Sequence, residues 1–160
     1  MVETDELVGR RWKLSELPGR IIALDYGRRR VGVAITDPSR TIATPLGVAR
    51  FARGREEEIP ERLLEWIREF RPTEILIGIP LHMDGTESEM AEEARALAGR
   101  LAATTGLPVV ERDERLTTVD ARRAMREMGM PRRKRREKGR DDMVAAALLL
   151  RGHLDAKNRC

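Results

Sequence analysis

Residues 20–37 read RIIALDYGRRRVGVAITD, and this stretch decides the fold. It contains two apolar runs, 21–25 and 31–36, which are separated by Gly27 and a basic triplet. Short apolar runs bounded by glycine, charged and turn residues are typical of buried strands. The pattern therefore predicts two neighbouring strands joined by a tight turn, with Asp25 at the end of the first strand.

The segments around this pair predict an alternation of strands and helices. Apolar runs and stripes indicate strands at 41–49, 74–79 and 109–112, and helices at 55–70, 87–104, after Thr117 and at 141–154. The first three strands form a meander, and each later strand follows a helix, as a crossover to a parallel strand requires. We therefore expect one α/β domain at 20–155, between a flexible N-terminal extension at 1–19 and a C-terminal tail at 156–160.

Positive charge is concentrated in one segment of the chain. Residues 131–140, PRRKRREKGR, hold seven of the 31 Lys and Arg residues and one of the 27 Asp and Glu residues, so the rest of the chain is slightly negative. A polyanion needs such a basic patch, although a solvated surface run would have the same composition. We favour nucleic-acid contact because the run lies inside the domain. The candidate contacts are Arg132, Arg133, Lys134, Arg135, Arg136 and Lys138.

The sequence also bears on where the protein works. No apolar run approaches the roughly 20 residues that a membrane-spanning helix needs. The N-terminal sequence MVETDELVGRRWKL lacks the apolar core of a secretory signal. Cys160 is the single cysteine, so the chain cannot form an internal disulfide. Together these features predict a cytoplasmic protein with no membrane partner.

Several acids follow predicted strands. In an open α/β sheet, ligands gather at the carboxyl ends of the parallel strands. Asp25, Asp84 and the pair at 113–114 would all share that edge. Asp37 ends a strand that runs the opposite way, and we expect it to be a turn residue at the other edge. On its own, Asp25 fits two roles equally well, as a ligand for a divalent cation or as a cap for the backbone of the next turn.

Two adjacent acids, Asp141 and Asp142, open the last predicted helix, whose body is strongly apolar. Either acid can serve as an N-cap that complements the helix dipole. Asp142 shares a helix face with Ala145, Ala146 and Leu149, and this face must pack on the sheet. We therefore expect Asp142 to turn inward, toward the strand ends.

Four blocks of the sequence resemble, in order, the motifs of one family. The blocks are RIIALDYGRRRVGVAITD at 20–37, EILIGIPLHMDGTES at 74–88, VVERDERLTTVDARRAM at 109–125 and KGRDDMVAAALLL at 138–150. They resemble the YqgF (RuvX-type) proteins, bacterial nucleases described as Holliday-junction resolvases or pre-16S rRNA nucleases. The resemblance covers about residues 20–155. It implies an RNase H-like α/β fold with a mixed five-stranded sheet, in the order 3-2-1-4-5, flanked by helices.

The resemblance also implies a catalytic site. By motif position, Asp25, Glu114 and Asp142 correspond to the family's catalytic acids, which would bind Mg²⁺ or Mn²⁺ as two ions. Glu114 would reach across the roughly 9–10 Å between the first and fifth strands better than Asp113 could. Arg115 and the basic run would hold phosphates. The secondary candidates are Asp141, Asp84, Thr117 and Thr118, and helix capping would also account for the two threonines.

Two other functions fit parts of the sequence. The Asp-Tyr-Gly turn is also similar to the phosphate loop of actin-like and sugar-kinase ATPases, but those proteins place two such domains around the nucleotide. A basic RNA-binding module with purely structural acids would explain the charge, although aromatic residues for base stacking make up 3% of the chain. We predict a metal-dependent nuclease, with structured precursor 16S rRNA favoured over branched DNA. Symmetric cutting of a junction calls for a two-fold dimer, and the sequence indicates a monomer or weak homodimer.

Overall fold

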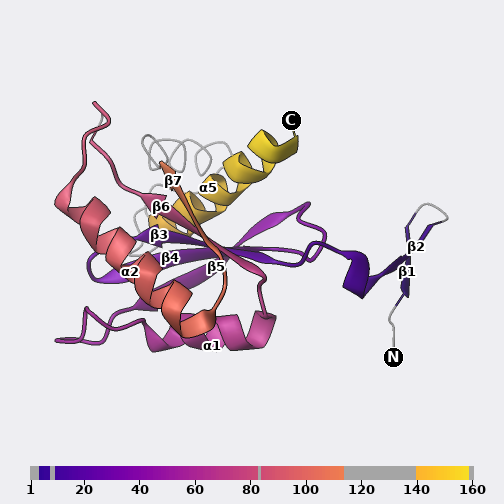
Figure 1. Cartoon of the computed structure of the whole chain (residues 1–160), viewed down its shortest axis with the longest axis horizontal. Coiled ribbons are helices and arrows are strands. Elements are labelled where there is room, and N and C mark those ends of the chain that lie inside the picture. Colours follow the sequence, from indigo (N-terminus) through magenta and orange to yellow (C-terminus); the bar gives the residue numbers. More distant parts are fainter. Residues whose placement is uncertain (1–3, 8–9, 83, 114–139, 159–160) are drawn as a thin grey trace.

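The computed structural model describes residues 4–7, 10–82, 84–113 and 140–158. Its main sheet has five strands, which are β3 (Ile21–Tyr26), β4 (Arg30–Thr36), β5 (Ala43–Arg50), β6 (Glu74–Ile79) and β7 (Val109–Asp113). They lie in the order β5-β4-β3-β6-β7 (Figure 1). β3, β4 and β5 pair antiparallel, whereas β6 runs parallel to β3 and β7 runs parallel to β6. Counted along these five strands, the order is 3-2-1-4-5, so the predicted mixed sheet is confirmed.

Helices cover both faces of the sheet. α1 (Glu61–Phe70) and α2 (Glu89–Thr105) pack on one face, and α5 (Arg140–Asn158) packs on the other (Figure 1). α2 begins after the N-cap Ser88, whose Oγ accepts a hydrogen bond from the Ala91 backbone N–H at 3.0 Å. It ends at Gly106, whose left-handed backbone (φ 70°) closes the last turn. The carboxyl ends of the parallel strands therefore lie between these two helical layers.

β3 is buried on both faces, which explains its continuous apolar run. Ile22 and Leu24 belong to the core under α1 and α2, whereas Ile21 and Ala23 pack against α5. Side chains alternate along a strand, so Asp25 shares the α5 face. The alternation of side chains along β3 thus places the Asp25 carboxylate on the face that α5 covers.

α1 begins later than the sequence predicted. The apolar stripe indicates a helix from residue 55, but the helix starts at Glu61. Pro60 occupies the N-cap position with an extended ψ of 131°, and a proline disfavours helical backbone in the residue before it. The preceding segment forms a turn instead, in which the Arg55 N–H donates to the Ala52 carbonyl at 2.8 Å. The proline therefore divides one apolar stripe into a turn and a helix.

Both ends of the chain contain more regular structure than predicted. β1 (Thr4–Leu7) and β2 (Arg10–Lys13) form an antiparallel hairpin outside the main sheet, and the short 3-10 helix η1 (Leu14–Glu16) follows. α5 continues to Asn158, past the predicted end at Leu154. The helix predicted after Thr117 and the basic run at 131–138 lie outside the described residues.

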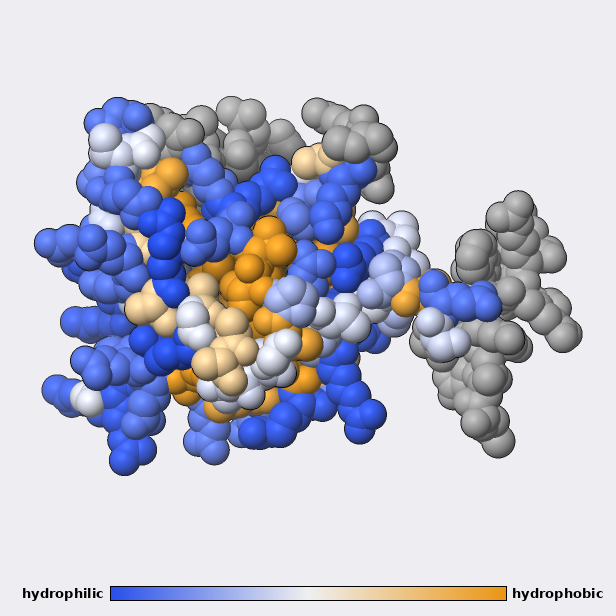
Figure 2. Space-filling view, in the orientation of Figure 1, coloured by the Kyte–Doolittle hydropathy of each residue, from blue (hydrophilic) through white to orange (hydrophobic). Residues whose placement is uncertain are grey.

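The surface is mainly polar. Hydrophilic side chains cover most of the face seen in Figure 2, and hydrophobic ones gather near its middle. In the described part of the chain, Ile42 is the one large hydrophobic side chain that is exposed. No helix within the described ranges is long and apolar enough to cross a membrane. Most large apolar side chains therefore serve to join the sheet to its helices.

The amino end of β6 carries a buried ion cluster on the α5 face. Glu74 Oε2 lies 3.1 Å from Arg40 Nη1, and Glu74 Oε1 lies 3.7 Å from His153 Nε2 and 4.0 Å from Lys157 Nζ. His153 is buried, and this burial, followed by the charge of Lys157, lowers its pKa. Because Glu74 pairs in register with Ile21, the cluster lies at the opposite end of the strands from Asp25. It joins the C-terminal part of α5 to the sheet.

Candidate active site at the carboxyl ends of the strands

Asp25 is the penultimate residue of the central strand. It pairs in register with Gly32 of β4 on one side and with Gly78 of β6 on the other. Its side chain is half-buried and lies on the face that α5 covers. A carboxylate in this position has lost part of its hydration, so it favours a site where cations or hydrogen-bond donors compensate.

α5 approaches the sheet very closely at Gly32. An ideal Cβ on this glycine would lie 2.1 Å from the carbonyl oxygen of Asp142 and 2.8 Å from its Cβ. No side chain fits in that space, so the glycine is what lets the first turn of α5 touch β4. Since Gly32 is the register partner of Asp25, the first turn of α5 lies over the strand position next to Asp25.

The prediction of which α5 face packs on the sheet is largely correct. Ala146 and Leu149 pack against β3, β4 and β6, and they follow Asp142 at helical spacing. Ala145 is also buried, but it belongs to a separate small cluster with Val144. Asp142 therefore stands at the start of the stripe that faces the sheet.

The carboxylate of Asp142 is held by a residue of β4. Arg30 Nε donates to Asp142 Oδ2 at 2.6 Å, and both side chains are about two-thirds buried or more. The adjacent acid behaves differently, because Asp141 Oδ1 is buried and accepts no hydrogen bond from the described part of the chain. The first turn of α5 thus contains one carboxylate paired with β4 and one buried carboxylate oxygen without a hydrogen bond from the described residues.

Other candidate acids lie outside this arrangement. Asp84 is exposed, and it accepts hydrogen bonds from the Thr86 backbone N–H and hydroxyl at 2.9 and 2.7 Å, which lower its pKa. These are the contacts of a turn residue. Asp37 is also a turn residue, as predicted. Burial alone would raise the pKa of Asp37, but hydrogen bonds from the Ser39 hydroxyl and from the N–H groups of Ile42, Thr41 and Ser39 lower it.

Asp113, at the end of β7, faces the other side of the sheet. Arg112 lies against Gly152 of α5, whereas Glu111 pairs with Arg95 of α2 at 3.4 Å. By alternation, Asp113 shares the α2 face with Glu111 rather than the α5 face with Asp25. Asp113 therefore does not share the face of Asp25. The remaining predicted site residues lie outside the described residues, and these are Glu114, Arg115, Thr117, Thr118, Arg132, Arg133, Lys134, Arg135, Arg136 and Lys138.

The donor set at this end of the sheet suits a hard cation. Asp25, Asp141 and Asp142 offer carboxylate oxygens, which Mg²⁺ and Mn²⁺ prefer. An unpartnered buried oxygen such as Asp141 Oδ1 is costly unless a cation or a donor compensates it. Within the described ranges, no group of three or more His, Cys, Asp or Glu side chains is close enough to hold a metal. A metal site at this edge would therefore require a ligand outside those ranges, and Glu114 is the residue that the sequence predicted.

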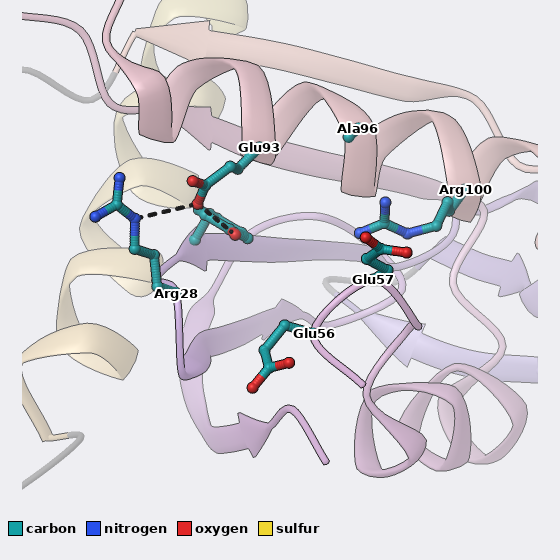
Figure 3. A pocket seen from close by; sticks show the side chains of 7 residues that line it. Arg28, Glu56, Glu57, Glu93, Ala96 and Arg100 are labelled. Carbon is teal, nitrogen blue, oxygen red and sulfur yellow. Dashed lines mark hydrogen bonds and ion pairs between the residues drawn. The ribbon is translucent and has the colours of Figure 1, made fainter. Parts of the chain in front are cut away.

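A separate pocket of about 630 Å³ opens on the α2 face (Figure 3). Tyr26 lines it, and its hydroxyl donates to Glu93 Oε2 at 3.0 Å. Burial, followed by that hydrogen bond, raises the pKa of Tyr26 to about 12, so the phenol stays protonated. Arg28 donates to the same Glu93 oxygen at 3.3 Å and also pairs with Glu89. Because Tyr26 and Asp25 are neighbours on a strand, this pocket and the acids lie on opposite faces of the sheet.

Sequence reasoning missed two residues that build the acid site. The ion pair between Arg30 and Asp142 joins positions 112 residues apart, which local periodicity does not reveal. Gly32 did carry a signal, since a glycine inside an apolar strand often marks a close backbone approach. The basic triplet was interpreted only as part of a turn.

Known proteins resemble this chain along most of its length. The sequence matches the family model described as RuvX, Holliday junction resolvase, over residues 19–156. A relative from Anaeromyxobacter sp. (strain Fw109-5) is 42% identical over 139 residues, covering 87% of this chain and 98% of the relative. A relative from Roseiflexus sp. (strain RS-1) is 38% identical over 144 residues, covering 90% and 99%. Both carry the name "Putative pre-16S rRNA nuclease".

Solved structures share the fold. T. thermophilus RuvC in complex with a Holliday junction substrate matches with a TM-score of 0.54 and 18% identity, covering 88% of this chain and 96% of that one. The yeast mitochondrial Holliday junction resolvase Ydc2 matches with a TM-score of 0.53 and 13% identity, covering 91% and 83%. At such low identity the likeness shows the architecture alone. It confirms the RNase H-like fold.

Proposed function

Because the chain belongs to the RuvX family, we propose that it is a metal-dependent nuclease that hydrolyses phosphodiester bonds in structured nucleic acid. One observation carries the proposal. The backbone of Asp142 contacts Gly32, and Gly32 is the register partner of Asp25. Two carboxylates from opposite ends of the sequence therefore share one face at the carboxyl ends of the strands.

In this proposal the site binds two ions, either Mg²⁺ or Mn²⁺. Their ligands would be Asp25, Asp142 and Glu114. When bound, the metal supplies a nucleophilic hydroxide and stabilises the leaving oxygen. The protein's own part is to hold carboxylate oxygens rigidly and to exclude bulk water on the face under α5. Arg115 and the basic run would bind phosphates and supply affinity. Asp141 is the second candidate ligand from the same helix turn.

Precursor 16S rRNA is the proposed substrate. The curated relatives described above carry that substrate in their names, and they match nearly the whole domain. The concentrated positive charge at 131–140 fits any polyanion, so it does not discriminate between RNA and DNA. Precursor rRNA processing would place the protein in the bacterial cytoplasm, and a monomer or a weak homodimer would suffice for cutting one strand.

Junction resolution is the second candidate. The description of the matching family model favours it, and the fold is shared with junction resolvases. A resolvase cuts two strands symmetrically and therefore acts as a two-fold dimer. Dimer formation on a four-way DNA junction, with paired cuts, would support this function over rRNA processing.

The decisive experiment compares Asp25→Asn with the wild type. We expect the purified wild type to cut a labelled precursor 16S rRNA fragment in Mg²⁺ and to stop when EDTA removes the metal. Asp25→Asn should lower the cleavage rate by more than about 100-fold, because even outer-shell partners of metal ligands contribute 10- to 100-fold. The amide keeps the shape of the side chain, so circular dichroism and RNA binding should stay unchanged.

Asp155→Asn is the matched control. Asp155 is exposed near the other end of α5, so the same loss of charge there should leave cleavage unchanged. Near-normal cleavage by a folded Asp25→Asn protein would reject the metal site. RNA binding that is independent of EDTA, without cleavage of RNA or of a DNA junction by the wild type, would instead indicate a non-catalytic binding module.

A further inference from the structure

Arg28, in the turn after β3, and Arg30, the first residue of β4, contact different helices. Arg28 pairs with Glu89 and Glu93 of α2, on the face opposite to Asp25. Arg30 pairs with Asp142 of α5, on the same face as Asp25. The three-residue basic run therefore distributes its side chains between the two faces. Of these two arginines, Arg30 is the one that contacts a proposed metal ligand.

The backbone of Arg30 is held in place by its neighbours. An ideal Cβ on Gly27 would lie 2.7 Å from the Arg30 carbonyl oxygen, so this glycine is what allows the turn to close so tightly. The carbonyl of Arg29 accepts a hydrogen bond from the Phe51 N–H at 3.1 Å. Arg30 itself begins β4 and pairs in register with Arg50 of β5. Its guanidinium thus extends from a rigid base.

The contact engages one of the two oxygens of Asp142. Arg30 Nε donates to Oδ2 at 2.6 Å, and charge-assisted hydrogen bonds of this kind are short and directional. The Arg30 side chain is 26% exposed and that of Asp142 is 32% exposed, so solvent competes only partly with the pair. The same aspartate is fixed at its backbone by the contact with Gly32. Side chain and backbone of Asp142 are therefore both held by β4.

We propose that Arg30 is a positioning residue for Asp142, fixing Oδ2 so that Oδ1 is presented to the metal beside Asp25. This inference rests on the proposed metal-dependent function. Metal-binding carboxylates are commonly held by an outer hydrogen-bond partner, and loss of such a partner weakens metal binding or activity by about 10- to 100-fold. Arg30 acts through Asp142 and does not itself touch the reacting phosphate.

Mn²⁺ binding to the nucleic-acid-free protein tests the inference. Titration followed by electron paramagnetic resonance measures the free ion, so the readout does not depend on cleavage. Arg30→Gln should bind Mn²⁺ about 10- to 100-fold more weakly than the wild type. Its kcat for RNA cleavage should fall at subsaturating metal, while KM for RNA stays unchanged. Arg28→Gln, two residues away but paired with α2, should match the wild type in all three measurements.

Arg30→Lys separates geometry from charge. Lysine keeps the positive charge beside Asp142 but lacks the planar Nε donor, so we expect Mn²⁺ affinity between those of the wild type and Arg30→Gln. The Arg30→Lys variant also keeps the inference testable when Arg30→Gln does not fold. If Arg30→Gln fails to fold, a reduced Mn²⁺ affinity of folded Arg30→Lys supports the inference and a wild-type affinity overturns it.

Several results would overturn the inference. Equal or tighter Mn²⁺ binding by Arg30→Gln would show that the arginine only competes with the metal for Asp142. A raised KM for RNA with unchanged kcat would show that Arg30 binds phosphate instead. Both outcomes leave the proposed function standing. A wild-type protein that binds no Mn²⁺ and cuts neither RNA nor a four-way DNA junction would overturn the proposed function and this inference together.

Discussion

Helix α5 meets the sheet through ion pairs near both of its ends, and the two contacts have opposite polarity. Near the first turn, the acid comes from the helix (Asp142) and the cation comes from the sheet (Arg30). Near the last turn, the acid comes from the sheet (Glu74), and the cation Lys157 and the imidazole of His153 come from the helix. Both arrangements complement the helix dipole, which favours acids at the N-terminus and bases at the C-terminus.

The difference lies in how the charges balance. At the C-terminal end, one carboxylate is surrounded by the guanidinium of Arg40, the ammonium of Lys157 and the imidazole of His153. The protein itself compensates that acid, so the contact serves as an anchor. At the N-terminal end, Asp141 and Asp142 start the helix beside Asp25, and a buried oxygen of Asp141 accepts no hydrogen bond from the described residues. Glu74 Oε1 is also buried without a hydrogen bond from the described residues, but Lys157 Nζ lies 4.0 Å from it and Arg40 pairs with the other oxygen of Glu74. We therefore expect an added cation at the acid end rather than at the anchor end.

We expect the largest effect from a substitution at the acid end of α5, where Asp142 lies. Asp142→Asn should lower the rate of RNA cleavage by more than about 100-fold, since the amide removes a proposed metal ligand. Asp141→Asn should cost much less. Cleavage rates at saturating Mg²⁺, with melting curves to confirm folding, measure both. If Asp141→Asn were the inactive variant and Asp142→Asn were active, Asp141 would be the ligand and Arg30 would hold a purely structural acid.

We expect the second-largest effect from a substitution at the anchor end of α5, where Glu74 pairs with the helix. Glu74→Gln should destabilise the protein by roughly 2–4 kcal/mol, because removing one partner leaves buried positive charge uncompensated. Chemical denaturation measures this loss. Below the melting temperature, Mn²⁺ binding and cleavage should stay at wild-type levels. A loss of cleavage in the folded variant would contradict the view that the anchor end serves stability and only the acid end serves metal binding.

A third test concerns the close approach that makes the acid end. Gly32→Ala should destabilise the protein by about 1–3 kcal/mol, because its Cβ would collide with the backbone of Asp142 and force α5 outward. Mn²⁺ affinity should fall as well. Gly99→Ala is the control, since nothing lies within 4 Å of a Cβ there and alanine favours a helix. Denaturant titration should show Gly99→Ala to be slightly more stable than the wild type.

The smallest effect concerns pH at the anchor end. Burial lowers the pKa of His153, the charges of Lys157, Arg112 and Arg40 lower it further, and Glu74 opposes them. The folded protein therefore prefers the neutral imidazole, while the unfolded chain titrates near its ordinary pKa of about 6.5. Stability should fall as the pH drops below that value, because the unfolded state then binds more protons.

Replacement of His153 isolates this contribution. The free energy of unfolding, measured at about pH 7.5 and about pH 5.5, should decrease less in His153→Gln than in the wild type. The comparison is the difference between the two pH values within each protein, so any constant cost of the substitution cancels. An equal or larger decrease in the variant would mean that His153 is not the group that couples protonation to folding.

Much of the fold could be predicted from the sequence because its strands are short, apolar and well bounded. The strand at 74–79 has the predicted limits, and the order 3-2-1-4-5 follows the family resemblance. Local exceptions came from residues whose effect depends on context. Pro60 delayed α1, and the hairpin at the N-terminus has no clear apolar alternation.

The candidate site was harder to predict because its key contacts join distant residues. Asp25 and Asp142 could be placed at one edge from the strand order and the helix face, and their roles as metal ligands remain predictions. The pairing of Arg30 with Asp142 depends on how the last helix crosses β4. Asp84 follows a strand as the rule requires, but its oxygens are used within its own turn. Proximity to a strand end is therefore necessary for such a site but not sufficient.

The contact between β4 and α5 can form only late in the synthesis of the chain. It joins residues 112 positions apart, and α5 closes the domain from the C-terminal side. At about 5–20 residues per second, translation reaches Asp142 roughly 6–22 s after Arg30. Throughout that interval the nascent chain carries Asp25 without its partner acid. If both acids are metal ligands, as proposed, the nascent chain cannot cleave RNA before Asp142 has been made.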